Sequence, residues 1–311
     1  MVGLENVRVL LGEPNVQVRR TVADSLRHHG YHSIRDTSQV EQIYEAVNED
    51  QIDVLICDVE LGGLDLCDLI YRVRHHQAGN NPFLVTIALV ANPTSDNIHK
   101  IVNSGSDDLL LKPVSVGQII ERLNILTKKR KGFVVTTDYI GPDRRKNGHR
   151  PGTVEIPVIE VPNPLRYKQQ DGADLMQMQA EVHAAAQLIN DHKMERHAHQ
   201  IDYLVKNIVP QYAIGDVGSE LTAMVARLSY VAEDLVRRMA DTKREHILHL
   251  GEAMIKVSSS IHKTPLSPSL KDVHLLPQLS AAISQAFVAD EQAIELAGDI
   301  AASVGRGVPG A

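Results

Sequence analysis

Five short runs with strand character alternate with amphipathic stretches along the first 127 residues. The strand-like runs are residues 7–11, 32–37, 53–58, 83–90 and 108–111. The stretches that follow them repeat apolar residues at helical spacing, over residues 18–30, 40–50, 64–76, 97–105 and 116–127. Buried parallel strands read as continuous apolar runs, because helices cover both faces of their sheet. The pattern predicts a doubly wound α/β domain over residues 5–127, with a five-stranded parallel sheet.

The segment 128–172 follows neither period. It contains five prolines, and between residues 128 and 150 eight Lys and Arg stand against two Asp and Glu, whereas the formal charge of the whole chain is -7. Turn-forming residues and a local excess of one charge are typical of a solvated linker. We therefore expect a basic, Pro-rich linker over residues 128–172.

Residues 173–306 follow helical periodicity. The first run is interrupted at Pro210 and Gly215, and the second begins at Ser219, a residue type that caps helix N-termini. The apolar stripe of the second run continues to Ile261, which predicts one helix of about forty residues, longer than most globular helices. Because long amphipathic helices must bury their apolar face, we expect a helical bundle or coiled coil that forms a dimer or other homo-oligomer.

Three polar side chains follow the predicted strands of the first domain at one edge of the sheet. Asp58 ends the third strand, Lys112 ends the fifth and Glu13 follows the first. The carboxyl ends of parallel strands meet at the same edge, so these residues are expected to lie together. A carboxylate oxygen of Asp58 could attack phosphorus, Lys112 would neutralise the added charge, and Glu13 could supply an oxygen ligand to Mg²⁺.

Three motifs at these strand ends resemble those of bacterial response-regulator receiver domains. They are VLLGEPN at the first strand, LICDVELGGLDL at the third and GSDDLLLKPV at the fifth. The resemblance covers about the first two fifths of the chain and implies a flavodoxin-like (βα)5 fold. It further implies that a histidine kinase or phosphotransfer protein phosphorylates Asp58, with Mg²⁺ held by Glu13, Asp58 and the backbone carbonyl of Glu60. A cis Lys112–Pro113 peptide and a shift of the face formed by the fourth and fifth units are also implied.

Three positions depart from the receiver pattern. Pro14 stands where a second acidic residue is usual, so the affinity for Mg²⁺ should fall. Val90 replaces the Ser or Thr that ends the fourth strand, and Leu109 replaces the switch aromatic of the fifth. Retention of Asp58 and Lys112 together favours phosphorylation, whereas the departures favour a receiver-shaped scaffold that is not phosphorylated.

Composition narrows the remaining classes of function. The two cysteines, Cys57 and Cys67, have no metal-finger spacing, and the chain contains no signal-like start and no long apolar span. A cytoplasmic protein without a membrane segment is therefore expected. A DNA-binding output is not favoured, because the C-terminal helices are long and acidic overall and no short basic recognition helix is evident.

Histidines of the C-terminal half leave one chemical alternative open. The long helical runs carry His192, His197, His199, His246 and His249. One of them could receive a phosphoryl group in a relay, although no His-x-x-Lys-Gly neighbourhood occurs. We favour an atypical response regulator without turnover activity, whose helices oligomerise and bind an unknown output protein.

Overall fold

The computed structural model describes residues 3–49, 51–145, 156–170, 174–215, 217–239 and 245–305. The chain forms two compact units, Met1–Ile189 and Asn190–Ala311. This division falls at a different place from the expected domain limits at residues 127 and 172. No helix in the described part of the chain is long and apolar enough to cross a membrane.

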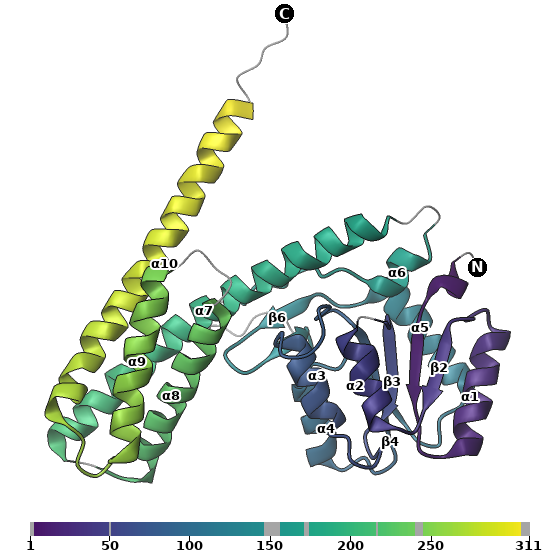
Figure 1. The fold of residues 1–311 in the computed structure, drawn as a ribbon, viewed down its shortest axis with the longest axis horizontal. Coiled ribbons are helices and arrows are strands. Elements are labelled where there is room, and N and C mark those ends of the chain that lie inside the picture. The colour runs from purple at the N-terminus through teal and green to yellow at the C-terminus, as the bar shows by residue number, and fades with distance from the viewer. Residues whose placement is uncertain are drawn as a thin grey trace, which may run out of the picture. The chain divides into compact units, whose positions relative to one another are not determined.

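A five-stranded parallel sheet forms the centre of the first unit (Figure 1). The order is β2-β1-β3-β4-β5, with strands β1 (Val9–Gly12), β2 (Ile34–Thr37), β3 (Val54–Asp58), β4 (Val85–Val90) and β5 (Asp108–Leu111). All residues of β1, β3 and β4 are buried, which explains their continuous apolar character. The predicted α/β fold and the number of strands are confirmed.

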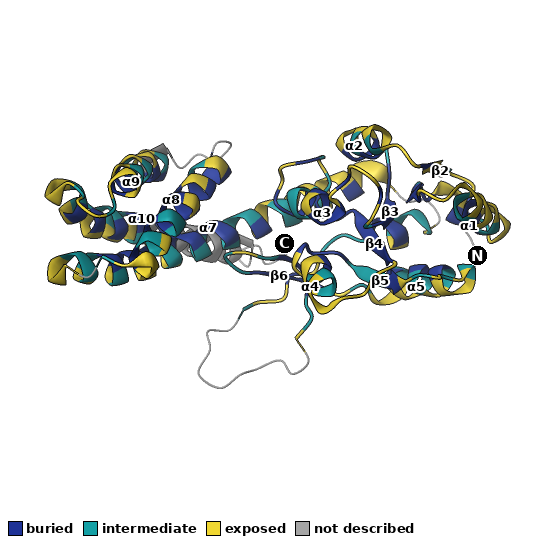
Figure 2. Cartoon of the chain, turned by 90° about the horizontal axis from the view of Figure 1, so that it is seen from below, coloured by how far each residue is buried: buried dark blue, intermediate teal, exposed yellow. Residues whose placement is uncertain are grey.

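Helices cover both faces of this sheet. They are α1 (Val16–His28), α2 (Val40–Asn48), α3 (Leu66–Arg74), α4 (Ser95–Asn103) and α5 (Val116–Lys129). One core cluster joins the sheet to α2, α3 and α4, and the other joins it to α1 and α5. Their buried faces point toward the strands and their exposed faces point to solvent (Figure 2). Four of these helices begin at a side-chain N-cap, which fixes where each leaves its loop: Asn15, Asp65, Thr94 and Ser115.

The segment expected to be a linker contains ordered structure that packs within the first unit. It forms the antiparallel hairpin β6 (Phe133–Val135) and β7 (Ile140–Pro142) and the short helix α6 (Pro164–Lys168). Ile159 pairs with Phe133 as an isolated bridge, and Phe133 and Leu165 are fully buried. The described part of residues 128–170 therefore extends the core of the α/β unit.

A buried charge cluster fastens the hairpin to the amino-terminal edge of the sheet. The Asp107 carboxylate lies 2.9 Å from Arg74 and 2.8 Å from Arg130. Both guanidinium groups lie over the Phe133 ring, at 5.1 and 5.3 Å from its centre. Burial lowers the pKa of Arg74 to about 10. Burial alone would raise the pKa of Asp107, but the two arginines hold it below its usual value.

The sequence GPDRR, residues 141–145 of the expected linker, contributes to the attachment of the hairpin to the sheet. Gly105 has a left-handed backbone conformation with φ at +89°, and a Cβ there would collide with the Ile140 carbonyl oxygen. The Arg144 guanidinium donates to the Ser106 carbonyl, and Arg145 pairs with the neighbouring Asp143 at 2.8 Å. The motif therefore packs against the turn between α4 and β5, and residues 146–150 of the basic stretch lie outside the described structure.

The second unit is helical, as predicted. It contains the second part of α7 (Leu175–Ile214), with α8 (Ser219–Met239), α9 (Glu245–Lys263) and α10 (Leu270–Gly305). The predicted forty-residue helix is wrong, because α8 ends at Met239 and α9 packs beside it in one apolar core. Pro210 does not end α7, which continues to Ile214. The apolar stripes are thus buried within one chain by folding back.

A hydrogen-bonded group of polar side chains, centred on His197 and Asp234, lies inside this helical core. His197 Nε2 lies 2.7 Å from Asp234, whose carboxylate also accepts from Arg238, and Arg238 reaches Asn190. His197 is fully buried, and its Nδ1 has no hydrogen-bond partner among the residues that the structure describes. Burial lowers the pKa of His197, opposed by Asp234 and reinforced by Lys193. The imidazole therefore takes up a proton less readily than an ordinary histidine.

Substitution of Phe133 tests the attachment of the hairpin. Phe133→Ala removes a fully buried ring from the cluster and should lower the free energy of unfolding by about 3–5 kcal/mol, measured by urea denaturation of the full chain. Val158→Ala, at an exposed position of the same segment, is the matched control and should change it by less than about 0.5 kcal/mol. Equal, small effects of both substitutions would show that the segment is a solvated linker.

Acidification tests the buried histidine. The unfolded state binds a proton near the ordinary histidine pKa of about 6.5, whereas folded His197 resists protonation, so stability should fall as pH drops below that value. The thermal midpoint of the second unit should therefore decrease between neutral pH and pH of about 5. His197→Gln should flatten this dependence. An unchanged pH dependence in the variant would remove His197 as its source.

Candidate functional site

Asp58, Glu13 and Lys112 come together at the carboxyl edge of the sheet. Asp58 is the last residue of β3, and Glu13 and Lys112 directly follow β1 and β5. The pairing of β1 with β3 places Gly12 opposite Cys57, so the following residues enter the same region. The Lys112–Pro113 peptide is cis, as the resemblance implied.

One ammonium group joins two buried carboxylates at this edge. Lys112 Nζ donates to Asp58 Oδ2 and, at 2.9 Å, to Glu13 Oε2. The other oxygens are also bonded: Asp58 Oδ1 accepts from the Glu60 amide at 2.7 Å, and Glu13 Oε1 accepts from the Asn15 amide at 2.9 Å. Asp58 is 2 % exposed and Glu13 is 0 % exposed. The site is therefore a compact carboxylate–ammonium–carboxylate bridge.

The electrostatics of this bridge keep Lys112 charged. Partial burial acts to lower the pKa of Lys112, but its hydrogen bonds and charge interactions with Asp58 and Glu13 raise it above the usual value. Burial and the neighbouring carboxylates raise the pKa of Cys57, so its thiol stays protonated and is not a competing nucleophile. The arrangement presents a carboxylate nucleophile beside a fixed positive charge, which suits transfer of an anionic group.

The three positions that depart from the receiver pattern lie after β1, at the end of β4 and within β5. Pro14 follows Glu13 and is exposed at the first loop, adding no acidic side chain. Val90 is fully buried at the end of β4, where no hydroxyl is available. Leu109 is half-buried and packs against the core cluster that includes α3 and α4. The nearby Thr94 hydroxyl accepts from the Asn97 amide and caps α4.

The oxygen atoms at this edge fit part of a Mg²⁺ coordination shell. The predicted ligands supply two carboxylates, from Glu13 and Asp58, and a backbone carbonyl from Glu60, whose side chain is exposed. Mg²⁺ takes six oxygen ligands in near-octahedral geometry, and it usually keeps several waters beside one or two carboxylates and a phosphate oxygen. Both carboxylates already bind the Lys112 ammonium. Within the described residues, no group of three His, Cys, Asp or Glu side chains could hold a metal ion.

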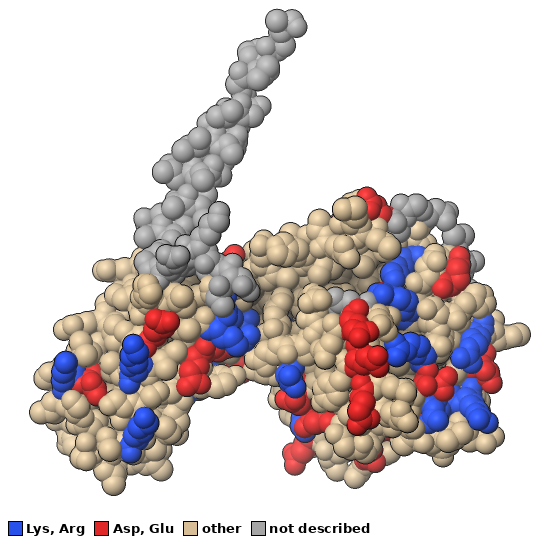
Figure 3. Space-filling view, in the orientation of Figure 1, with Lys and Arg blue, Asp and Glu red and all other residues tan. Residues whose placement is uncertain are grey.

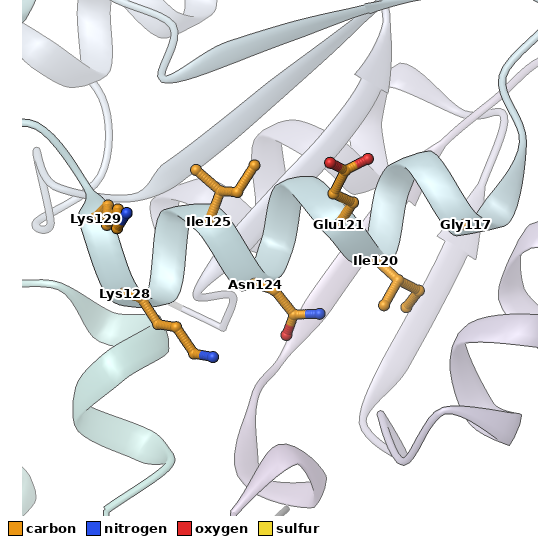
Figure 4. Close-up of a pocket in the computed structure, with 7 residues that line it drawn as sticks. All are labelled: Gly117, Ile120, Glu121, Asn124, Ile125, Lys128 and Lys129. Carbon is orange, nitrogen blue, oxygen red and sulfur yellow. The ribbon is translucent and has the colours of Figure 1, made fainter.

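A second surface feature lies on α5, away from the acidic side chains of the bridge. It is a shallow, open pocket on one face of this helix (Figure 4), lined by Gly117, Ile120, Glu121, Asn124, Ile125, Lys128 and Lys129. None of the three bridge residues lines it.

The histidines of the helical half occupy different environments. His192 is half-buried and His249 is exposed, and each lies beside a glutamate three residues later in its helix. His199 is exposed, whereas His197 is inaccessible in the core. The side chain of His246 lies outside the described residues. Burial of His197 could have been read from the sequence, because the residue continues the apolar stripe of Met194 and Ile201 at helical spacing.

Comparisons with known proteins agree with this geometry. Residues 9–124 match the model of the response regulator receiver domain. The two-component response regulator PhoP of Pseudomonas aeruginosa is 30 % identical over 124 residues, which cover 38 % of this chain and 53 % of PhoP. The sensory/regulatory protein RpfC of Xanthomonas campestris is 23 % identical over 120 residues, covering 39 % of this chain and 16 % of RpfC.

A solved structure with a similar domain is the receiver domain of the Francisella response regulator 1452. It is 26 % identical, covers 40 % of this chain and all of its own, and superposes with a TM-score of 0.34. The chain spans about half the length of PhoP and a smaller part of RpfC. These matches leave the helical half outside their range. The family match and the observed fold together identify residues 9–124 as a response regulator receiver domain.

Proposed function

We propose that this chain is an atypical response regulator that accepts a phosphoryl group on Asp58. The observation that carries the proposal is the Lys112 ammonium, which bonds the Asp58 carboxylate at the carboxyl edge of a receiver fold. Receiver domains act with histidine kinases or phosphotransfer proteins, so the donor is a phosphohistidine of such a partner. The domain is a signalling module of a two-component system.

The transfer step follows from the orientation of Asp58. One carboxylate oxygen attacks the phosphorus, the P–N bond of the phosphohistidine breaks, and the imidazole nitrogen retains the bonding electron pair and takes up a proton. Lys112 stabilises the negative charge that gathers on the phosphoryl oxygens. The Glu60 amide, which donates to Asp58 Oδ1, fixes the rotation of the carboxylate. The chain thus provides a nucleophile, an orienting donor and a counter-charge.

The helical half is proposed to bind the output partner and to join copies of the chain. Several large apolar side chains of its helices are exposed, including Tyr203 at 63 % and Ile214 at 76 %. Exposed apolar side chains mark a protein-interaction site where they form a contiguous patch, and the proposal is that these side chains contribute to one. On the face shown in Figure 3, the described Lys and Arg side chains are mixed with Asp and Glu and form no continuous basic surface, which does not favour DNA.

A receiver-shaped scaffold that is not phosphorylated is the second candidate. It is favoured by Val90 and Leu109, which lack the hydroxyl and the ring expected at the switch positions. In that case the bridge around Lys112 would only stabilise the folded domain. A relay to a C-terminal histidine is the third candidate, and of the histidines considered above His199 and His249 are exposed.

Labelling with acetyl phosphate separates these candidates. The full chain should gain one base-labile acyl phosphate, detected by intact mass and mapped by peptide analysis to Asp58. Asp58→Asn should lose it, whereas Asp65→Asn, which removes an exposed carboxylate of the same loop region, should keep it. An unlabelled wild type would support the scaffold, and phosphate mapped to the helical half would support the relay.

Lys112 should contribute to the rate of labelling. Lys112→Ala removes the positive charge beside the reacting oxygens and should reduce the maximal rate by about 100-fold, the usual effect of losing one such group. Lys100→Ala removes an exposed lysine that pairs with Asp65 and is the matched control, with an unchanged rate. Equal rates for both variants would rule out a role for Lys112 in the transfer.

A further inference from the structure

We infer that strand β5 and the hairpin transmit movements of the Asp58 site to α7, the helix that contributes residues to both units. As a signalling route, this inference rests on the proposed phosphorylation of Asp58. It goes beyond that proposal because it names the segment through which the receiver acts on the helical half. The contacts at the two ends of β5, and those that continue from the hairpin into α7, support it.

Strand β5 is short and is held by a charged side chain at each end. Lys112 follows its last residue and contacts the Asp58 carboxylate. Asp107 precedes its first residue and binds the two buried arginines described above. The strand between them has four residues and spans only about 13 Å. A displacement of one end therefore either moves the other end or breaks a paired charge.

The hairpin packs directly on the turn that leads into β5. The Ile140 carbonyl oxygen lies so close to Gly105 that a Cβ there would collide with it. Arg144 donates to the carbonyl of Ser106, the next residue of the turn. Asp107, which follows, is the acid of the buried charge cluster that holds the hairpin. Three consecutive residues of the turn are thus attached to the hairpin segment, so the turn and the hairpin are expected to move together.

The hairpin in turn shares an apolar core with the first part of α7. Phe133 and Ile140 of the hairpin cluster with Ile189, and three further residues of α7 pack against this cluster: Val182, Ala185 and Ala186. These four positions of α7 are three or four residues apart, so they lie on one face of the helix. The hairpin therefore holds α7 by that face.

The same helix is attached to α8 within the second unit. Asn190 accepts from Arg238 at 3.1 Å, and the His197 ring bonds Asp234 at 2.7 Å. Asn190 directly follows Ile189, so the two attachments adjoin along α7. Residues 175–209 contain no Pro and no Gly, the residues at which helices most often kink. A displacement of the first part of α7 is therefore passed to the part that binds α8.

Hydrogen–deuterium exchange, followed by mass spectrometry of peptides from the full chain, tests this coupling. Lys112→Met releases the site end of β5. It should raise the exchange rates of peptides covering residues 132–142 and 182–189 at least about fivefold, the lower end of typical coupling between linked sites. Lys100→Met removes an exposed lysine of α4 that pairs with Asp65 and is the matched control, with unchanged exchange.

Peptides from α2, residues 40–48, report loosening of the whole domain in the same samples. Their exchange should not change in Lys112→Met. An equal rise in α2 and in the hairpin would show that the substitution only destabilises the domain. An unchanged hairpin would show that the two ends of β5 move independently. Either result would overturn the inference.

The coupling should also be seen from the hairpin end, because coupling between two sites is reciprocal. Arg144→Gln releases the turn before β5 and should raise the exchange rate of the Lys112 amide at least about fivefold. In the folded chain this amide donates to the Val90 carbonyl at 2.8 Å. Arg145→Gln changes the neighbouring arginine, which pairs with Asp143, and is the matched control. Equal effects of the two substitutions would contradict the inference.

Phosphorylation gives a separate result. Treatment with acetyl phosphate should change the exchange of the hairpin and α7 peptides in the wild type and not in Asp58→Asn. A labelled Asp58 with unchanged exchange would overturn the signalling route and leave the proposed function intact. An absence of labelling would refute the proposed function, whereas the exchange of the Lys112 and Arg144 variants would still decide whether β5 couples its two ends.

Discussion

The interaction on which the receiver site depends is the contact of one ammonium group with two buried carboxylates. Asp58 and Glu13 lie in the interior edge of the sheet, where an unpaired negative charge would be costly. Lys112 reaches both, and the cis peptide that follows it belongs to the same loop. The bridge therefore connects the ends of β1, β3 and β5, and it helps to set the register of the sheet at this edge.

The opposite edge of the sheet is organised by a second charge group. Asp107 pairs with Arg74 and Arg130, and Phe133 packs against both arginines. Through this group the hairpin and α6 become part of the receiver's compact unit, and α7 follows them along the chain. The receiver therefore carries an extension that the family match, which ends at residue 124, does not include.

Much of the fold was predictable from the sequence, because buried strands and helices have clear periods. The site was predictable for Asp58, Glu13 and Lys112, since parallel strands bring their ends together. The hairpin was not predictable, because its strands are only three residues long and lie among prolines and charged residues. Its burial also depends on residues that are distant in the sequence. The break between α8 and α9 was also missed, because an apolar stripe continues across it and periodicity cannot show where a helix folds back.

The most direct test of the central bridge is a double-mutant cycle of Lys112→Met and Asp58→Asn. The free energy of unfolding of the wild type, both single variants and the double variant would be measured by urea denaturation of the full chain. The bridge predicts a coupling energy of about 1–3 kcal/mol, because each side chain loses its partner in the single variants. Effects that add to within about 0.5 kcal/mol would contradict the bridge.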